Sequence, residues 1–160
     1  MTTAPEAEVM RVIRNSCRQF MTGSQREITV DEQQFWFEIN RGSRIVHPFL
    51  FGPRPFQRQA ITAFGFGLVR LRVRGTEWQW IVSGGLAPDY RGKGYGLELF
   101  GQLTTIVHGM LQPAWLDVFE DNVSARHVYE RLGYVEHSVT VDGAAGSRPI
   151  ITMRKDPPPP

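Results

Sequence analysis

Cysteine is nearly absent from this chain of 160 residues, in which Cys17 is the single cysteine. One cysteine cannot form a disulfide within the chain, and no group of Cys and His has the spacing of a zinc site. We therefore predict no metal site. A chain without disulfides is typical of the reducing cytoplasm, so a cytoplasmic location is expected.

Long apolar runs are also missing. No stretch approaches the roughly 20 apolar residues that a membrane helix needs. The first residues, MTTAPEAEVMRV, are acidic and contain no apolar core, so they do not resemble a signal peptide. The sequence therefore predicts a protein without a membrane partner.

The chain also lacks a strong excess of positive or negative charge, since it contains 18 Lys and Arg and 16 Asp and Glu. A net charge of +2 is too small to indicate a nucleic-acid partner by itself. Basic residues gather only at Arg70, Arg72 and Arg74, which would share one face of a strand. A solvated sheet face is the favoured interpretation. A nucleic-acid-associated protein is an alternative, which a steep salt dependence of binding would support.

The length is that of one domain, and a chain of this size can bury roughly 70% of its unfolded surface. No internal repeat or change of composition divides it. We predict one domain over 1–156 and a disordered polyproline tail over 157–160.

Apolar periodicity and turn residues predict two helices, three strands, a helix, a strand, a helix and two final strands. The predicted ranges are 5–21, 31–40, 44–51, 60–73, 77–86, 94–111, 114–119, 122–132, 134–141 and 149–154. This order indicates an α/β (α+β) domain around one mixed sheet. Because 77–86 and 114–119 flank a helix, they should be parallel.

Local signals predict how the first two helices are bounded and oriented. Gly23 should end the first helix, and Thr29 or Asp31 should cap the second. The apolar face of the second helix should consist of three residues, Phe35, Trp36 and Ile39.

The most informative segment is LAPDYRGKGYG, residues 86–96, between a strand and an amphipathic helix. Gly92, Gly94 and Gly96 lack the Cβ atoms that would obstruct a phosphate near the backbone. The helix that follows offers free N–H groups and the positive end of its dipole, and Arg91 and Lys93 add charge. This pattern suits a pyrophosphate. The segment lacks the GK[ST] ending of a Walker loop, and it is a poor dinucleotide fingerprint.

Two motifs here resemble the GCN5-related N-acetyltransferase (GNAT) superfamily. Arg91-Gly92-Lys93-Gly94-Tyr95-Gly96 matches the R/Q-x-x-G-x-G/A acetyl-CoA motif at every fixed position. Residues 117–134, DVFEDNVSARHVYERLGY, resemble the family's strand–Asn–helix segment. With the helix between them, the two motifs cover roughly residues 77–135.

A weaker resemblance lies upstream. Ile13-Arg14-Asn15, Arg18, Ile28-Thr29 and Phe35-Trp36-Phe37 are similar to a branch that acetylates amino sugars and ribosomal-protein N-termini. Members of the superfamily usually open with a strand, whereas this chain is predicted to open with a helix.

The resemblance implies a GNAT fold whose two parallel strands splay apart and admit the pantetheine arm of acetyl-CoA. Gly84 and Gly85 would form a bulge that opens the sheet. The acetyl-CoA-binding residues would be Leu86, Ala87, Arg91, Gly92, Lys93, Gly94, Tyr95, Gly96 and Asn122, and the Leu86 N–H would face the thioester oxygen. Asn122 would also cap its helix.

The implied reaction is direct transfer of the acetyl group to a primary amine of a small molecule, such as an amino sugar, or of a protein. Tyr129 would protonate the CoA thiolate, although its spacing also fits a packed core residue. Asp117 would be the base, with Glu77, Glu120 or a water chain as alternatives.

The sequence also allows a different kind of protein, one that binds acetyl-CoA without turnover. Release of CoA thiol with a true acceptor distinguishes the two. The acceptor itself would be selected by the first two helices, their connecting loop and the loops 52–59 and 142–149. A homodimer is left open.

Overall fold

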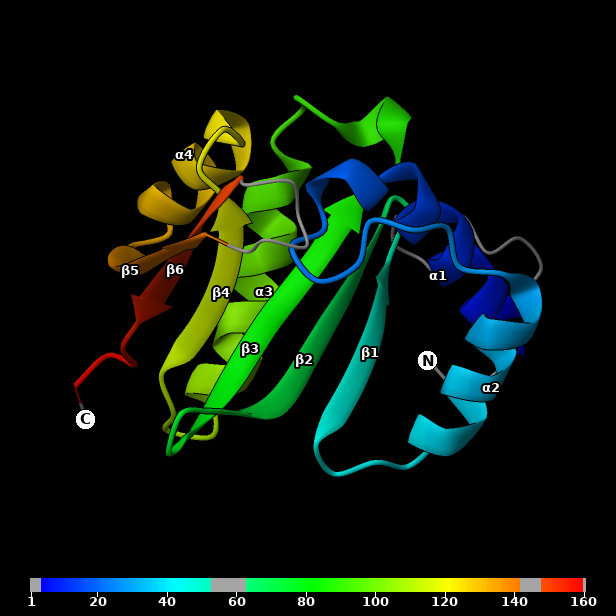
Figure 1. The fold of residues 1–160 in the computed structure, drawn as a ribbon, viewed down its shortest axis with the longest axis horizontal. Helices are drawn as coiled ribbons and strands as arrows, with labels where there is room; N and C mark the ends of the chain where they lie inside the picture. Colours follow the sequence, from blue (N-terminus) through cyan, green and yellow to red (C-terminus); the bar gives the residue numbers. More distant parts are fainter. Residues whose placement is uncertain (1–3, 53–62, 142–147, 160) are drawn as a thin grey trace.

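Six strands form one mixed sheet in the order β1-β2-β3-β4-β6-β5 (Figure 1). This computed structural model describes residues 4–52, 63–141 and 148–159. The strands are β1 (Val46–Phe51), β2 (Gly65–Arg74), β3 (Glu77–Leu86), β4 (Ala114–Phe119), β5 (Val135–Val141) and β6 (Pro149–Lys155). Only β3 and β4 pair in parallel, so the expected mixed sheet is confirmed.

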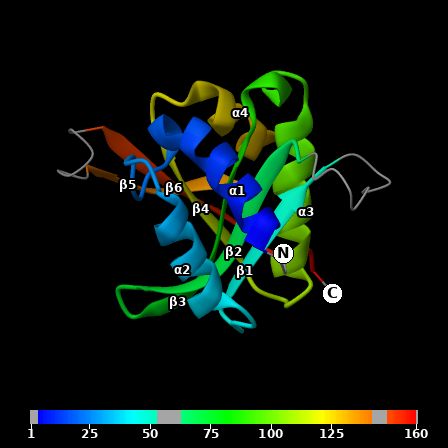
Figure 2. The same cartoon turned by 90° about the vertical axis from the view of Figure 1, so that its right-hand side faces the viewer.

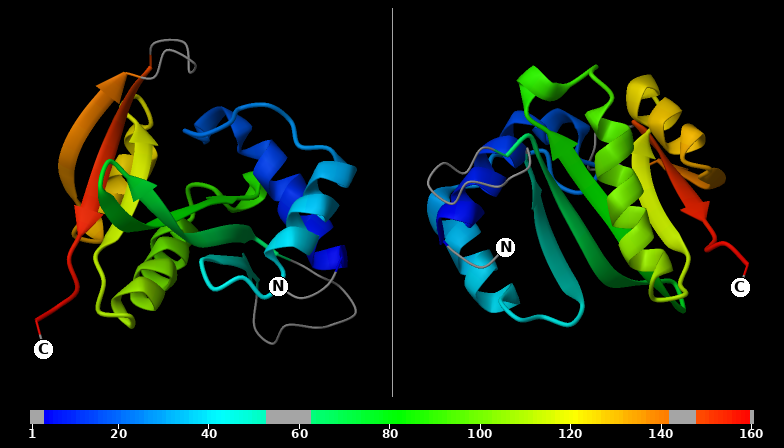
Figure 3. Two further views of the ribbon diagram at one scale, coloured as in Figure 1. Left: turned by 60° about the horizontal axis from the view of Figure 1, so that its bottom comes forward. Right: turned by 180° about the vertical axis from the view of Figure 1, so that it is seen from behind.

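Helices cover both faces of the sheet (Figures 2 and 3). They are α1 (Ala4–Ser16), α2 (Val30–Asn40), α3 (Tyr95–His108) and α4 (Val123–Arg131). A Cβ added to Gly67 would meet Leu103 of α3, whereas one added to Gly85 would meet Cys17 after α1. Because these contacts come from opposite faces, α3 and α4 lie on one side of the sheet and α1 and α2 on the other.

The main core lies between the sheet and α3. Leu99, Leu103 and Val107 recur at helical spacing and are fully buried against β2, β3 and β4. Burying a side chain of this size contributes about 1.5–3 kcal/mol to stability. This packing fixes α3, and therefore the glycine-rich segment before it, relative to the end of β3.

The ends of the helices follow sequence signals. Thr29 caps α2 in a capping box with Glu32, since each side chain accepts a hydrogen bond from the other residue's backbone N–H. Asn122 caps α4 through Ala125 N, at 3.3 Å. Gly133 follows α4 with a φ of 87°, a conformation that favours glycine.

The parallel strands β3 and β4 separate as predicted. Their ladder contains only two pairs, Trp80 with Ala114 and Ile81 with Trp115. Beyond these pairs β3 continues to Leu86 and β4 to Phe119 without bonding to each other, so the sheet is open at the carboxyl ends of both strands.

Two predictions about the helices were wrong. The α-helix ends at Ser16 and a short 3₁₀ turn follows over Arg18–Phe20, so Gly23 does not end it. On α2, Trp36 packs against the core as predicted, but Phe35 and Ile39 are exposed by 66% and 63%, while Gln33 and Phe37 are buried. The buried positions are four residues apart, and this register turns Phe35 and Ile39 toward solvent.

The predicted bulge at Gly84 and Gly85 was also wrong, because β2 and β3 pair in unbroken register over their full length. Close packing requires these glycines instead. A Cβ at Gly84 would lie 2.5 Å from Phe66 O, and one at Gly85 would lie 2.7 Å from Cys17 Sγ.

Several predicted features lie outside the described residues. These are the start of the strand predicted from residue 60, positions 53–59 of one specificity loop and 142–147 of the other. Residues 157–159 of the tail have no regular secondary structure. Within the described ranges, no helix is both long and apolar enough to cross a membrane.

Candidate active site

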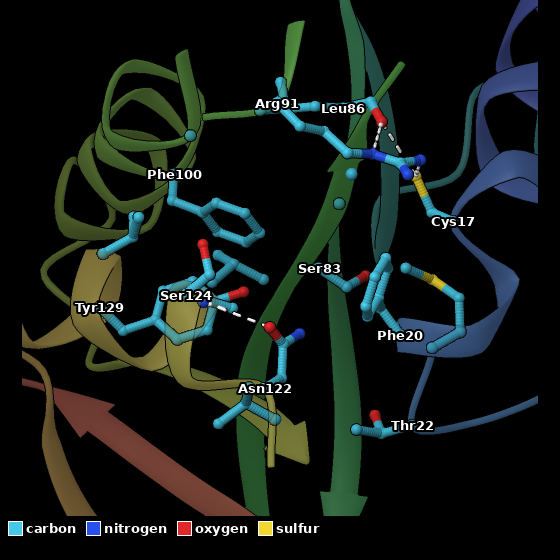
Figure 4. A pocket seen from close by; sticks show the side chains of 18 of the residues that line it. Cys17, Phe20, Thr22, Ser83, Leu86, Arg91, Phe100, Asn122, Ser124 and Tyr129 are labelled. Atoms are coloured by element: carbon cyan, nitrogen blue, oxygen red, sulfur yellow. Dashed lines mark hydrogen bonds between the residues drawn. The ribbon is translucent and has the colours of Figure 1, made fainter. Parts of the chain in front are cut away.

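A cavity of about 320 Å³ occupies the gap between β3 and β4 (Figure 4). Its walls come from the turn after α1 on one side and from α3 and α4 on the other. The lining residues are Cys17, Phe20, Met21, Thr22, Val82, Ser83, Gly84, Gly85, Leu86, Arg91, Gly92, Gly94, Gly96, Phe100, Asp117, Val118, Asn122, Ser124, Ala125, Val128 and Tyr129. The splayed strands therefore open into one chamber that reaches both sides of the sheet.

The glycine-rich segment forms one end of this cavity. The backbone N–H groups from Gly92 to Gly96 have no acceptor among the described residues. Gly92 and Gly94 adopt φ values of 71° and 87°, which side chains rarely tolerate, and they lie directly before α3. Consecutive free amides at a helix N-terminus fit the negative oxygens of a pyrophosphate.

The side chain of Arg91 points away from this segment, toward α1. Its Nε donates to Leu86 O at 3.1 Å, and its Nη2 donates to Ser16 O at 2.9 Å. The same Nη2 lies 3.3 Å from Cys17 Sγ, which itself donates to Leu86 O at 3.2 Å. We call Arg91, Ser16, Cys17 and the Leu86 carbonyl the α1–β3 clasp. It ties the end of α1 to the end of β3.

Three predicted cofactor residues do not line the cavity. The Ala87 N–H donates to Phe64 O at 2.9 Å, and the Tyr95 ring packs on Phe64 with centroids 4.8 Å apart. Lys93 is exposed beside the amide segment. Of these three, Lys93 alone offers a charged group to an anion approaching from solvent.

The free edge of β3 presents backbone groups to the gap. The bond from Ala87 N to Phe64 O marks a hydrogen-bonded pair of the β2–β3 ladder. Such pairs alternate in an antiparallel ladder, so the N–H groups of Leu86 and Gly84 point away from β2 and toward β4. A flexible chain inserted between the strands would meet these groups as a neighbouring strand does.

Tyr129 projects from α4 into the same cavity. Its side chain is 7% exposed and packs edge-on against Phe100, with centroids 4.8 Å apart. The hydroxyl makes no hydrogen bond to the described part of the chain. Burial, and secondarily the nearby Tyr134, raise the pKa of Tyr129, so the hydroxyl keeps its proton at neutral pH. A neutral, unpartnered donor therefore faces the chamber.

Asp117 lines the cavity, but its carboxylate is already engaged. Oδ2 accepts from Arg74 Nη2 at 2.6 Å and Oδ1 accepts from Thr152 Oγ1 at 2.8 Å, while Arg74 Nη1 donates to Thr152 at 2.7 Å. The carboxylate is therefore occupied by an ion pair and a hydroxyl hydrogen bond. The alternative bases are no better placed, since Glu77 and Glu120 are exposed and neither lines the cavity.

The cavity wall that follows α1 is held in place by Arg14 and Asn15, two residues of the motif that resembles the amino-sugar and ribosomal-protein branch. Asn15 exchanges two hydrogen bonds with the backbone of Ile28, at 2.8 and 2.9 Å, and Arg14 Nη1 donates to Arg26 O at 2.6 Å. These bonds fix the segment between α1 and α2, which includes Phe20 and Thr22 of the cavity wall. The sequence shows this motif but does not show which groups its side chains bind, because backbone carbonyls leave no pattern in a sequence.

A sequence model of the Acetyltransferase (GNAT) family matches residues 31–134. This chain belongs to that family. It is therefore an acetyltransferase, as the two motifs predicted. No curated protein sequence matches this acetyltransferase closely enough to count as a relative.

Solved structures share the fold of this acetyltransferase at low sequence identity. The spermidine N-acetyltransferase from Vibrio cholerae in complex with CoA and spermine has a TM-score of 0.75 and 16% identity, over 95% of this chain and 90% of that one. A protein provisionally named phosphinothricin N-acetyltransferase has a TM-score of 0.78 and 15% identity, over 99% and 97%. A GNAT-family acetyltransferase from Streptococcus pneumoniae has a TM-score of 0.73 and 16% identity, over 98% and 96%.

No cluster that could hold a metal ion exists among the described His, Cys, Asp and Glu side chains.

Proposed function

We propose that this acetyltransferase moves an acetyl group from acetyl-CoA directly to a primary amine of a small molecule or a protein. The observation that carries the proposal is the single cavity that joins the free amides of Gly92–Gly96 to the gap beside Tyr129. The solved spermidine N-acetyltransferase, which shares the fold, was crystallised with CoA.

In this proposal different residues bind different parts of acetyl-CoA. The amides of Gly92, Gly94 and Gly96 bind the pyrophosphate, with Lys93 adding charge from solvent. The N–H groups of Gly84 and Leu86 bind the inserted pantetheine arm, and that of Leu86 polarises the thioester carbonyl. Asn122 keeps its cap, and its Nδ2 can still donate to the arm.

The remaining predicted residues act less directly. Arg91 holds Leu86 in place through its carbonyl, and Ala87 and Tyr95 support the ends of the glycine-rich segment by packing. None of these three needs to touch the cofactor.

The chemical step forms a nitrogen–carbon bond and breaks the carbon–sulfur bond of the thioester. The thioester supplies the activated acetyl group and a thiolate leaving group. Tyr129 gives its proton to that thiolate. The amine must lose a proton as well, and a water molecule beside Asp117 takes it, with the carboxylate orienting that water.

The test is CoA thiol release from acetyl-CoA with a panel of amines that includes amino sugars, polyamines, amino acids and peptides. Acetyl-CoA binding is measured in parallel by calorimetry. Tight binding together with thiol release that depends on one acceptor supports the proposal. Binding without release for any acceptor would identify a binding module.

A further inference from the structure

The face of the sheet opposite α3 carries an unbalanced set of arginines. Side chains alternate along β2, so Arg70, Arg72 and Arg74 point to the side of α1 and α2. The β2–β3 hairpin curls across this face until Arg74 meets Asp117 and Thr152 (Figure 3, left). The arginines therefore lie on the same side of the sheet as the turn after α1, which lines the gap between β3 and β4.

Arg70 is half-buried on this face and forms no ion pair with any described residue. Its Nε is buried without a hydrogen-bond partner, and within the described ranges no carboxylate pairs with it or with Arg72. Burial, and then repulsion from Arg72, lower the pKa of Arg70, while the charge of Asp117 opposes the shift. Asp117 of the cavity wall thus acts on Arg70 electrostatically, but no described carboxylate forms an ion pair with Arg70.

A second unpartnered group lies beside it. Gln79 is 5% exposed, and its Oε1 is buried without a hydrogen bond. In the β2–β3 ladder Gln79 stands directly opposite Arg72, so it shares the arginine face. Leaving a buried polar atom unpaired costs about 1–3 kcal/mol, which favours a ligand that supplies the missing partners.

The carboxylates of this face do not balance the arginines. Asp117 is used by Arg74 and Thr152, and Glu77 is exposed at the hairpin end opposite Arg74. A polyamine would need free carboxylates here and would be repelled by Arg70. An acceptor with its own negative charge would instead be attracted.

We propose that the acceptor is a small amine that also carries an anionic group, a carboxylate or a phosphate, and that Arg70 binds this group with help from Arg72. The inference rests on the proposed acetyl transfer and names its substrate class. Holding the anion on β2 directs the amine toward the gap in which the thioester lies. The unpaired Gln79 Oε1 would accept a hydrogen bond from an N–H or O–H group of the acceptor.

Matched acceptors test the anion requirement directly. Phenylalanine is compared with phenethylamine, and an amino-sugar phosphate with the same amino sugar lacking the phosphate. Spermidine represents the polyamines. We expect thiol release to show kcat/KM at least roughly tenfold higher for the anionic member of one pair, and the favoured pair distinguishes carboxylate from phosphate.

Variants of Arg70 assign the effect to this residue. Arg70→Gln should lower kcat/KM for the anionic acceptor roughly 10- to 100-fold and leave that for its neutral partner unchanged. Arg70→Lys keeps a charge and should retain part of the activity. Arg44→Gln is the control, because Arg44 is exposed before β1 and makes no side-chain bond to the described residues.

Preference for spermidine or for the neutral amines would overturn the inference. So would an equal loss for both members of a pair in Arg70→Gln. Absence of thiol release for every acceptor would contradict the proposed function instead. In that case calorimetry tests the anion site by itself, by measuring the binding of phenylalanine and of the amino-sugar phosphate to the protein–CoA complex. Binding must occur and must depend on Arg70. If neither compound binds, the anion site is refuted.

Discussion

Tyr129 is the residue on which the proposed chemistry depends most. Tyr129→Phe keeps the ring against Phe100 and removes only the proton donor, so the chemical step should slow roughly 100- to 10,000-fold. Acetyl-CoA affinity should fall by about 1 kcal/mol or less, the worth of one hydroxyl contact. Single-turnover kinetics and calorimetry measure the two quantities separately.

Tyr134 supplies a matched control for this variant. Its buried hydroxyl donates to Thr104 at 2.7 Å and lies outside the cavity, so Tyr134→Phe should cost about 1 kcal/mol of stability and leave turnover intact. Equal losses of turnover in both variants would return Tyr129 to a packing role.

The hydroxyl of Tyr129 also predicts how turnover depends on pH in the basic range. Because burial raises the pKa of Tyr129, the acid stays protonated above about pH 10, where an ordinary tyrosine ionises. Turnover should rise as the amine loses its proton and then stay level up to about that pH. A fall in turnover well below about pH 10 that is absent in Tyr129→Phe would mean that Tyr129 ionises at that lower pH and that burial does not raise its pKa.

Gly96 tests the anion site better than Gly94 does. Gly94 has a positive φ, so Gly94→Glu would strain the backbone as well as block a phosphate. Gly96 lies in the first turn of α3, and an added Cβ would meet Val128 at an ordinary 3.7 Å. Gly96→Glu should therefore abolish acetyl-CoA binding by calorimetry with the fold retained, since its carboxylate repels phosphate.

Gly96→Ala is the control for that variant, because it adds the Cβ without the charge and should retain most of the affinity. Unchanged affinity in Gly96→Glu would mean that the phosphates bind elsewhere.

At the scale of elements, the α1–β3 clasp joins the acceptor side of the cavity to the cofactor side. Arg91→Gln removes charged hydrogen bonds to Ser16 and Leu86 and should cost about 1.5–3 kcal/mol of stability. Hydrogen exchange should accelerate at the end of α1, whereas Arg131→Gln on the exposed surface of α4 should change neither quantity. Unaltered exchange in α1 would show that the clasp does not hold it.

Local signals predicted most elements, because caps and strand periodicity depend on neighbouring residues. The bounds of β3 and β4 were predicted correctly, and Thr29 and Asn122 cap the helices named for them. The direction of a side chain across space could not be predicted. Arg91 belongs to the predicted acetyl-CoA motif, but its side chain bonds to α1. Gly85 has no side chain because Cys17, 68 positions away in the chain, occupies that space.

In the molecule as a whole, we propose that the two substrates meet in one cavity and that the acetyl group passes between them directly. Cys17 makes this claim testable, because its thiol also lines the cavity and would be the natural site of an acetyl-enzyme intermediate. Direct transfer needs no covalent intermediate, whereas transfer through Cys17 would release CoA before any amine binds.

The decisive measurement is therefore CoA release and intact protein mass after mixing with acetyl-CoA, first without and then with an amine acceptor. Direct transfer should give no stoichiometric thiol release and no acetylated protein without the amine, and equal amounts of CoA and N-acetylated product with it. A burst of CoA equal to the protein concentration, with one acetyl group on Cys17 in the absence of acceptor, would contradict it.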